Sequence, residues 1–335
     1  MKVLTDKKRE IWKGIVNKAR ADGDYSLEVV SFARSRKLIV IRWTASVAAA
    51  ILVICGAYYL AIKPLSSPML HESVLAQVYQ DTTSHTTLTL SSGEVIVLDG
   101  SQAKSEDVAE LQGEGGLDFR KLESESLARS VQTMETGRGK QSHVILSDGT
   151  KVWLNANSKL QFPGRFSNSN REVSIEGEVY FEVAKNKNQP FIVKSEHNHV
   201  RVLGTHFNVR SYPTETMKTV TLLEGSVEVR SADMSKKLTL KPAEQSIQQG
   251  NEGLHARVVT NPEAVIAWKE GQFYFEDADA QSIVKELERW YPVRIHLKEH
   301  DETKRISGRI RRDDSMKEVV EMLRFFDIEV SITER

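Results

Sequence analysis

The feature that most constrains this chain is an uninterrupted apolar stretch over residues 43–62, which reads WTASVAAAILVICGAYYLAI. It contains no charged residue and has about the 20 residues that a helix needs to cross a bilayer. Basic residues gather on its N-terminal side, at Arg34, Arg36, Lys37 and Arg42. Such a bias keeps the N-terminus in the cytoplasm. We therefore predict a single transmembrane helix over 43–62, with the rest of the chain outside the cytoplasm.

Two cleavable signals and a buried helix compete with this interpretation. A secretory signal peptide has a short basic lead and an apolar core of roughly 7 to 15 residues, whereas here the lead covers residues 1–42. A lipoprotein signal needs a small residue before its cysteine, and Cys55 follows the bulky Ile54 in the middle of the stretch. A helix buried in a soluble core stays open as an alternative. A retained single-pass anchor explains the stretch best.

Composition limits what the exported part can be. About 270 of the 335 residues follow the stretch, enough for one large or two moderate domains. The 46 Lys and Arg balance the 46 Asp and Glu, so the net charge gives no sign of nucleic-acid binding. The single cysteine lies inside the apolar stretch, which excludes an intrachain disulfide and a cysteine-based metal site.

Residues 1–42 predict a short helical segment on the cytoplasmic side. Within residues 5–19, Ile11, Trp12 and Ile15 lie on one side of a helix. One interpretation is a docking element that binds a cytoplasmic partner through these three side chains. The other is a juxtamembrane helix whose basic residues only fix the topology. We do not expect a segment of this size to hold a fold of its own.

Residues 63–84 are predicted to be a linker, after which apolar residues alternate as they do in strands. Three segments share a strand, tight turn, strand pattern, and they cover residues 88–98, 144–154 and 222–229. Repeated short hairpins of this kind are typical of antiparallel sheets. The pattern predicts a hairpin-rich, all-β domain over residues 85–255.

The longest predicted strand covers residues 171–184, where apolar and polar side chains alternate strictly. Glu176, Glu178 and Glu182 share its polar face, and paired carboxylates can perform acid–base chemistry. The strict alternation instead favours a strand face that is solvated or paired with cations. Before this strand, residues 101–139 are rich in Ser, Glu, Gln and Gly and are interpreted as a surface excursion from the β body.

Histidines and glycines of the β region give weak signals for a ligand site. His197 and His199 would project from one face of a strand, with His206 nearby, but no clear third and fourth ligand completes a metal pattern. Three glycines lack the preceding strand and the following Lys-Ser/Thr of a phosphate loop, namely Gly113, Gly115 and Gly116. We therefore predict neither a metal nor a cofactor.

The stretch over residues 259–335 has a different pattern. It predicts the order strand, helix, strand, strand, helix, strand, with the first helix over residues 278–291. Ser315, followed three residues later by Glu318, gives the capping-box signature of the second helix. Three acidic residues are interpreted as helix-start residues rather than metal ligands, namely Asp279, Asp313 and Asp314. The order predicts a compact α+β domain made of two similar halves.

Several motifs of the β region occur together in one known family. They are SDGTKVWLNA, EGEVYFEVA and VRVLGTHFNV, within residues 136–249. With them the chain resembles the periplasmic sensor domain of FecR-type anti-sigma regulators, in the form common among Bacteroidetes. The C-terminal stretch is similar to the C-terminal domain of the same regulators, which resembles the short N-terminal (STN) module of secretins and TonB-dependent transporters. The motifs are hairpin turns and apolar strand faces, so they identify a fold rather than a catalytic centre.

The resemblance implies a bacterial inner-membrane protein that relays the state of an outer-membrane TonB-dependent transporter to a cytoplasmic sigma factor of the extracytoplasmic-function (ECF) class. It implies contact with the sigma factor inside and with the transporter's signalling domain in the periplasm, and no direct contact with nucleic acid. Family members usually carry several helices before the span, whereas residues 1–42 resemble only the end of that domain. Two alternatives are a periplasmic adaptor without sigma-factor activity and an envelope-acting enzyme. No catalytic constellation in the sequence favours the enzyme.

One motif raises a chemical hypothesis, because some regulators of this family split themselves at a Gly-Thr bond in a position that matches Gly204-Thr205. The Thr205 hydroxyl would attack the Gly204 carbonyl in an N-to-O acyl shift, and the ester would then hydrolyse. The alternative is that Gly204 permits a tight bend and Thr205 is an ordinary strand residue. His206 is adjacent but points to the opposite face of a strand, so no activating base is evident.

Overall fold

The structure is a computed structural model, and it describes residues 85–98, 108, 111–113, 116–250, 253–298 and 301–334. These residues all belong to one compact unit of the chain, Pro68–Arg335. The predicted cytoplasmic segment (1–42), membrane span (43–62) and linker (63–84) lie outside the described residues. Within the described part of the chain, no helix is both long and apolar enough to span a bilayer.

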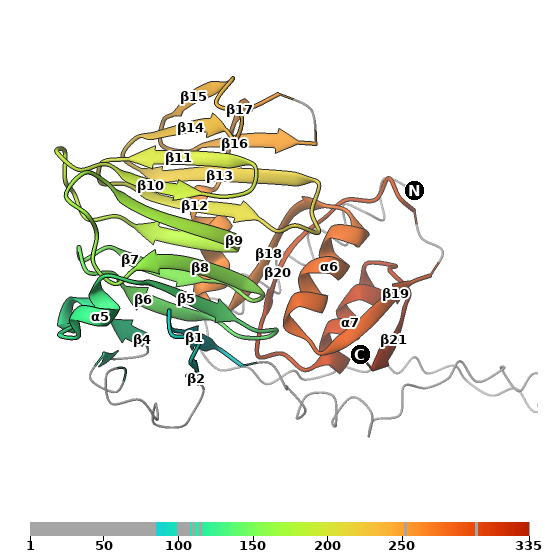
Figure 1. The fold of residues 1–335 in the computed structure, drawn as a ribbon. Coiled ribbons are helices and arrows are strands. Elements are labelled where there is room, and N and C mark those ends of the chain that lie inside the picture. Colours follow the sequence, from blue (N-terminus) through green and yellow to red (C-terminus); the bar gives the residue numbers. More distant parts are fainter. Residues whose placement is uncertain are drawn as a thin grey trace, which may run out of the picture. The chain divides into compact units, whose positions relative to one another are not determined.

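The predicted antiparallel β domain is present, and its strands form two layers (Figure 1). The first layer runs in the order β2 (Val95–Val97), β1 (Thr87–Thr89), β5 (Val131–Thr136), β8 (Ser158–Pro163), β9 (Arg171–Glu182), β10 (Phe191–Lys194), β11 (Asn198–Val202), β14 (Val227–Ser231) and β15 (Lys237–Leu240). Within this layer all neighbours are antiparallel except β9 and β10.

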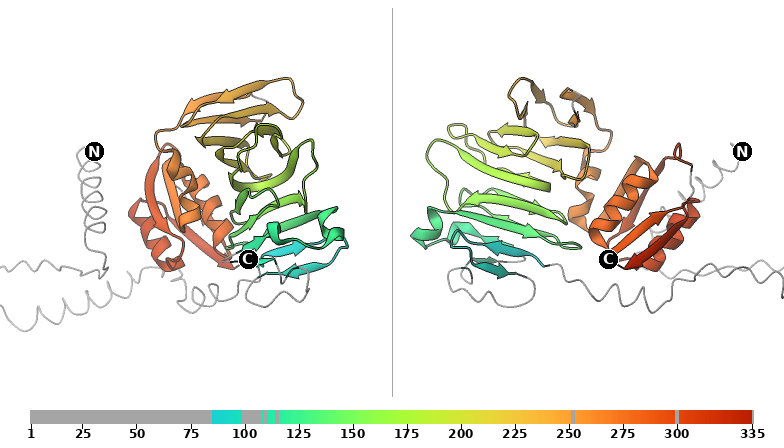
Figure 2. Two further views of the ribbon diagram at one scale, coloured as in Figure 1. Left: turned by 90° about the vertical axis from the view of Figure 1, so that its left-hand side faces the viewer. Right: turned by 45° about the vertical axis from the view of Figure 1, so that its right-hand side comes forward.

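The second layer shares the long strand β9 with the first. It runs in the order β3 (Gln112–Gly113), β4 (Gly116–Asp118), β6 (Ser142–Ile145), β7 (Lys151–Leu154), β9, β12 (His206–Ser211), β13 (Met217–Glu224), β16 (Glu244–Gln249) and β17 (His255–Val258). Consecutive hairpins therefore alternate between the layers as they stack, and Figure 2 shows this stack from two further sides.

A single glycine lets β9 pass from one layer to the other. The first half of β9 pairs with β8 and β10, and the second half pairs with β7 and β12. Gly177 lies where the two halves meet and has a φ of 92°. A Cβ at this position would lie 2.5 Å from Ser158 Oγ and 2.7 Å from Ser158 Cα. Only glycine combines this backbone conformation with so close an approach.

Two of the three predicted hairpins are confirmed, and the third is wrong. Strands β1 and β2 pair around Ser91-Ser92-Gly93, and β6 and β7 pair around Ser147-Asp148-Gly149. Over residues 222–229, however, β13 pairs with β12 and β16, whereas β14 pairs with β11 and β15. The turn at Gly225 therefore carries the chain across to the other layer. A hairpin and a crossover have the same local alternation, so the sequence pattern could not separate them.

The predicted surface excursion over residues 101–139 is also wrong where the structure describes it. Residues 119–121 form a 3₁₀ turn, η1 (Phe119–Lys121), and a short helix follows, α5 (Glu125–Ala128). Leu117, Phe119 and Leu127 are buried in the core of the β domain. β5 is an internal strand between β1 and β8. A few well-spaced apolar side chains thus anchor a segment whose composition is typical of a loop.

The C-terminal region has the predicted order of elements. They are β18 (Gln272–Ala278), α6 (Ala280–Trp290), β19 (Val293–Leu297), β20 (Ile306–Arg311), α7 (Met316–Phe325) and β21 (Val330–Glu334). β18 pairs with β20 and β19 pairs with β21, both antiparallel. Asp279 caps α6 by accepting from Ser282 N, and Ser315 and Glu318 form the predicted capping box of α7. Asp313 and Asp314 precede this cap, and both pair with Arg311.

The β domain and the C-terminal domain each have an apolar core of their own. The β-domain core takes side chains from both layers, and the C-terminal core takes them from α6, α7 and the four strands. β17 extends the β domain to Val258, past the predicted limit at residue 255. A 3₁₀ segment, η2 (Pro262–Glu270), connects the two domains. A likeness of the C-terminal domain to the STN module stays a prediction.

Candidate functional site

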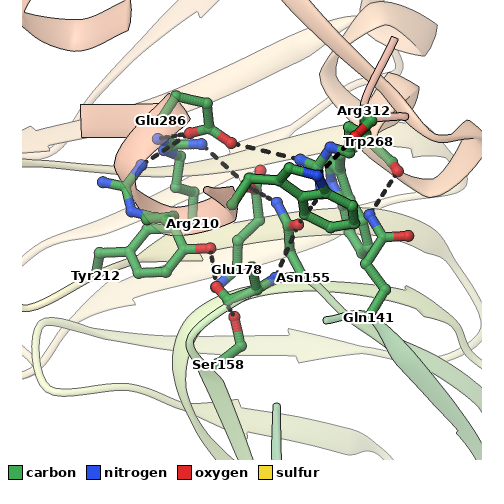
Figure 3. Close-up of polar contacts among 12 residues, drawn as sticks. Gln141, Asn155, Ser158, Glu178, Arg210, Tyr212, Trp268, Glu286 and Arg312 are labelled. Atoms are coloured by element: carbon green, nitrogen blue, oxygen red, sulfur yellow. Dashed lines mark hydrogen bonds and ion pairs between the residues drawn. The ribbon is translucent and has the colours of Figure 1, made fainter. Parts of the chain in front are cut away.

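The most unusual feature of the described structure is a set of buried charges where the β domain meets the C-terminal domain (Figure 3). Three carboxylates and three guanidinium groups form it, namely Glu178, Glu215, Glu286, Arg210, Arg289 and Arg312. We call this set the interdomain charge network. Charged side chains are seldom buried unless they are paired, so the network is the candidate functional site.

Glu178 is the most deeply buried acid of the network, with 2% of its surface exposed. Its carboxylate accepts hydrogen bonds from Asn155 Nδ2 at 2.8 Å, Asn208 Nδ2 at 3.0 Å and Arg210 Nη1 at 3.0 Å. Its backbone N–H donates to Ser158 Oγ at 2.9 Å, next to the bend at Gly177. Burial raises the pKa of Glu178, against the opposing effect of Arg210. The prediction of a cation-paired strand face is correct for Glu178, but this face is covered by a second domain.

Arg210 on β12 connects the two domains. Its guanidinium donates to Glu215 in a bidentate manner, at 2.9 Å from Nε and 2.7 Å from Nη2. The same Nη2 donates to Glu286 of the C-terminal domain at 2.8 Å. The charges of these acids outweigh burial and hold the pKa of Arg210 well above its usual value. Arg210 therefore stays charged and acts as a fixed bridge.

The C-terminal domain contributes the other half of the network. Glu286 and Arg289 lie one turn apart on α6, and Arg289 Nη1 donates to Glu286 at 2.8 Å. Arg289 also pairs with Glu215, and Arg312 Nη1 donates to Asn155 Oδ1 at 2.7 Å. Burial alone raises the pKa of Glu286, but the charges of Arg210, Arg289 and Arg312 outweigh it and lower the pKa to about 2. Glu286 is thus an anion at any physiological pH.

The charges on the two sides are complementary. The β domain supplies two acids and one arginine, and the C-terminal domain supplies one acid and two arginines. Each side alone therefore carries an excess charge of opposite sign, and docking neutralises both. Burial of a charge without its partner is costly, so the network favours one docked arrangement over other possible ones.

Aromatic and polar contacts surround the network. The Arg289 guanidinium lies 4.1 Å from the ring centroid of Tyr212. Lys269 of η2 reaches back to the β domain, where its Nζ lies 4.4 Å from the ring centroid of Trp153 and 3.8 Å from Glu182. Gln141 Nε2 donates to Trp268 O at 2.7 Å. These contacts tie the connecting segment, as well as the C-terminal domain, to the β domain.

A cleft of about 470 Å³ adjoins the network, lined along one side by β18 and along the other by residues of β13, β16 and β17. Two N–H groups of side chains that line it, Trp268 Nε1 and Arg312 Nε, are buried without a protein partner. Among the described residues, no group of His, Cys, Asp and Glu could hold a metal ion. His197, His199 and His206 do not gather into a site. The network is suited to holding the two domains in register.

The structure gives Gly204 and Thr205 defined packing roles. Gly204 has a φ of 148°, and a Cβ there would lie 2.7 Å from the Cα of Lys185. Thr205 is 3% exposed, and its hydroxyl donates to Ser226 O at 3.0 Å. His206 faces Glu224 at 3.5 Å. Among the described contacts, the hydroxyl therefore binds a carbonyl and meets no base. Ile11, Trp12 and Ile15 lie outside the described residues.

Sequence reasoning placed Glu178 on a polar strand face but did not find the other members of the network. Two sequence signals pointed toward it. Glu286 and Arg289 have helix spacing beside the apolar face of α6, and Arg210 follows Asn208 by two residues on one strand face. Neither signal identifies a partner in another domain, so the network could be recognised only from the three-dimensional structure.

Comparison with known proteins agrees with the two domains. Residues 132–228 match the family described as FecR protein, and residues 272–335 match the family described as FecR, C-terminal. Two crystal structures of a candidate anti-sigma factor from Parabacteroides distasonis ATCC 8503, at 2.50 Å and 1.65 Å resolution, are similar to this chain. Each is 26% identical with a TM-score of 0.53, and the match covers 61% of this chain and 99% of the other.

No functionally curated protein matches the chain significantly in sequence. The three acids and three arginines of the network are divided between the two matched regions, so the network joins one family domain to the other. The two family matches, in this order, and the similar anti-sigma structures identify the chain as a FecR-type anti-sigma factor.

Proposed function

We propose that this protein is a single-pass inner-membrane anti-sigma regulator that relays the state of an outer-membrane TonB-dependent transporter to a cytoplasmic ECF sigma factor. The observation that carries the proposal is the charge network, which couples the FecR domain to the FecR C-terminal domain. A relay needs an element with two arrangements that a partner can bias. Docked and undocked domains supply such arrangements without any catalytic step.

On the periplasmic side, the partner of the C-terminal domain is the transporter's signalling domain. Each of the strands β18 to β21 pairs with one neighbour within its two-stranded sheet. A strand with one paired edge can accept a further strand from another protein. Deleting residues 259–335 should leave the β domain folded and abolish copurification with a transporter. Undiminished copurification would move the partner's site to the β domain.

On the cytoplasmic side, the sigma factor binds the segment before the span through Ile11, Trp12 and Ile15. An apolar stripe on a short helix has no core of its own to enter, which favours a partner. In a pull-down with the full chain, Trp12→Ala should weaken capture of the sigma factor more than charge reversal at Lys8 and Lys13. If the wild-type segment captures no sigma factor, the cytoplasmic half of the proposal is wrong.

The relay itself is tested in cells that carry a sigma-dependent reporter gene. Glu286→Gln removes one charge from the network without changing the size of the side chain. We expect this variant to lose most of the transporter-induced change in reporter activity. Glu321→Gln, on the exposed face of α7, is the matched control and should respond as the wild type does. If the reporter responds to the transporter in Glu286→Gln as it does in the wild type, the charge network takes no part in the relay.

A further inference from the structure

A second depression at the junction of the two domains lies next to the point where the described chain begins. It has a volume of about 590 Å³, and its walls come from the loop after β5 and from the end of α6. Three consecutive residues, Trp290, Tyr291 and Pro292, give it an apolar floor, and Lys140 lines its β-domain side. We call it the junction groove. Its size falls in the range of pockets that bind small ligands or short peptide segments.

Backbone hydrogen bonds connect the first described residue to this groove. Gly137 N donates to His85 O at 3.1 Å, and two residues later Gly139 N donates to Arg289 O at 3.0 Å. Gly139 approaches α6 so closely that a Cβ would lie 2.7 Å from Trp290 O. The chain that precedes His85 therefore starts beside the groove. Tyr79, six residues earlier, can reach at most about 20 Å from His85.

The composition of residues 68–84 complements the groove. This segment has acidic residues at Glu72 and Asp81 and no lysine or arginine, and its apolar residues concentrate over 74–79, as VLAQVY. The charged residues lining the groove include three basic and two acidic ones, namely Lys140, Arg311, Arg312, Glu270 and Asp313. Arg311 pairs with Asp313 and Asp314, and Arg312 pairs with Glu286. An apolar run next to an acid thus precedes a groove with an apolar floor and a lysine on its β-domain side.

We propose that residues 74–81 of this same chain dock in the junction groove, with Val78 and Tyr79 on the Trp290–Pro292 floor and Asp81 near Lys140. Both domains form the groove, so separating them would release the segment. Under the proposed function, this segment leads to the membrane span. Its release would therefore signal to the membrane side that the two domains have separated. Only this consequence rests on the proposed function; the docking itself does not.

Photo-crosslinking of the full chain in detergent tests the docking. The photoreactive residue p-benzoylphenylalanine replaces Tyr79, and the adducts are mapped by mass spectrometry. We expect adducts within one chain, at residues 139–141 or 290–292. Adducts only elsewhere in the chain, adducts between two chains, or no adduct would each overturn the proposal. The result does not depend on a sigma factor or a transporter, so it fails or succeeds separately from the proposed function.

Charge variants add a second, independent measurement. Lys140→Glu should lower the yield of the Tyr79 adduct about fivefold, because an exposed ion pair becomes a repulsion. Adding Asp81→Lys to this variant should restore the yield. Lys187→Glu, a charge reversal at an exposed site on the β domain, is the control and should leave the yield unchanged. An equal yield in Lys140→Glu and Lys187→Glu, or no rescue by the double variant, would contradict docking through this charge.

Discussion

The substitution Glu286→Gln is the sharpest test of the charge network. Glu286 receives hydrogen bonds from Arg210, Arg289 and Arg312, and its side chain is 13% exposed. Glutamine keeps the size and one carbonyl oxygen but removes the charge. Arg210 would keep its pairs with Glu178 and Glu215, and Arg289 would keep its pair with Glu215, whereas Arg312 would lose its ion pair. We expect the docking of the two domains to weaken, while the apolar core of each domain stays intact.

The magnitude follows from the pKa of Glu286. The network lowers this pKa from 4.5 to about 2. One pKa unit corresponds to about 1.4 kcal/mol, so the charged form is favoured by roughly 3 kcal/mol in the folded state. The loss of one partner from a buried ion pair costs a similar amount, about 3 to 5 kcal/mol. The variant's loss of stability is smaller than this amount, because the negative charges of Glu286 and Glu178 repel each other in the wild type. This repulsion raises the pKa of Glu178, and it disappears in the variant.

Urea unfolding of the purified chain at pH 7 measures this loss by tryptophan fluorescence, to which Trp268 and Trp290 contribute together with the other three of the five tryptophans. A loss of 2 to 3 kcal/mol should lower the midpoint of the transition that separates the domains by about 1 M urea. Glu321→Gln should lie within about 0.5 kcal/mol of the wild type, as surface substitutions do. If the two variants unfold at the same midpoint, the loss of one charge from the network does not destabilise docking and the reasoning is wrong.

The pH dependence of the unfolding free energy is a second test of the contribution of Glu286. The folded-state pKa of Glu286 lies below its unfolded value, so its contribution is fully present above about pH 4.5. The contribution is lost as the pH falls from there toward 2, because the unfolded chain takes up the proton first. Glu286→Gln should therefore show a flatter loss of stability over this acid range than the wild type. Equal slopes for both proteins would contradict the lowered pKa.

Four other predictions follow from described contacts or from the proposed topology. Gly177→Ala should destabilise the β domain by about 2 kcal/mol or more in urea unfolding, because both the backbone conformation and the contact with Ser158 oppose a Cβ. Gly93 has a similar φ of 87° but lies in open space, so Gly93→Ala measures the cost of the backbone conformation alone. Lys269→Met should cost about 1 kcal/mol by removing the cation from Trp153 and Glu182. Intact-mass analysis should find one uncleaved species for wild type and Thr205→Ala alike, whereas fragments that meet between Gly204 and Thr205 would establish self-cleavage. A reporter that works only after export should be active when fused after Arg335, and a reporter that works only in the cytoplasm should be active when fused near Arg20. The reverse pattern would reject the topology.

Local patterns in the sequence predicted local structure well. The turns at Ser91-Ser92-Gly93 and Ser147-Asp148-Gly149 predicted their hairpins, because a tight turn with glycine fixes how the two flanking strands meet. The capping box at Ser315 and Glu318 predicted where α7 begins, because it depends on residues three positions apart. The order of elements in the C-terminal domain followed from the change between strand and helix periods. In each case the physical cause lies within a few residues.

Features that depend on distant partners could not be predicted in the same way. The residues around Gly225 look like a hairpin, but the partners of β13 and β14 lie in different layers. Phe119 lies in a segment with the composition of a loop and is nevertheless buried. Glu178 and Glu286 are 108 positions apart in the sequence, and Arg210 donates hydrogen bonds to both of their carboxylates. Periodicity assigns a side chain to a face and says nothing of what covers that face.

The use of charges at this junction, where apolar side chains would also pack, has a physical consequence for a relay. An apolar contact stabilises association in proportion to the area it buries, and it accepts many relative positions. A buried ion network gains little net free energy on docking, because desolvation offsets much of the attraction, yet a misplaced charge without its partner is costly. Such a network therefore selects one docked arrangement without making it permanent. We infer that the two domains of this anti-sigma factor can separate when a partner binds and return to the same register when it leaves.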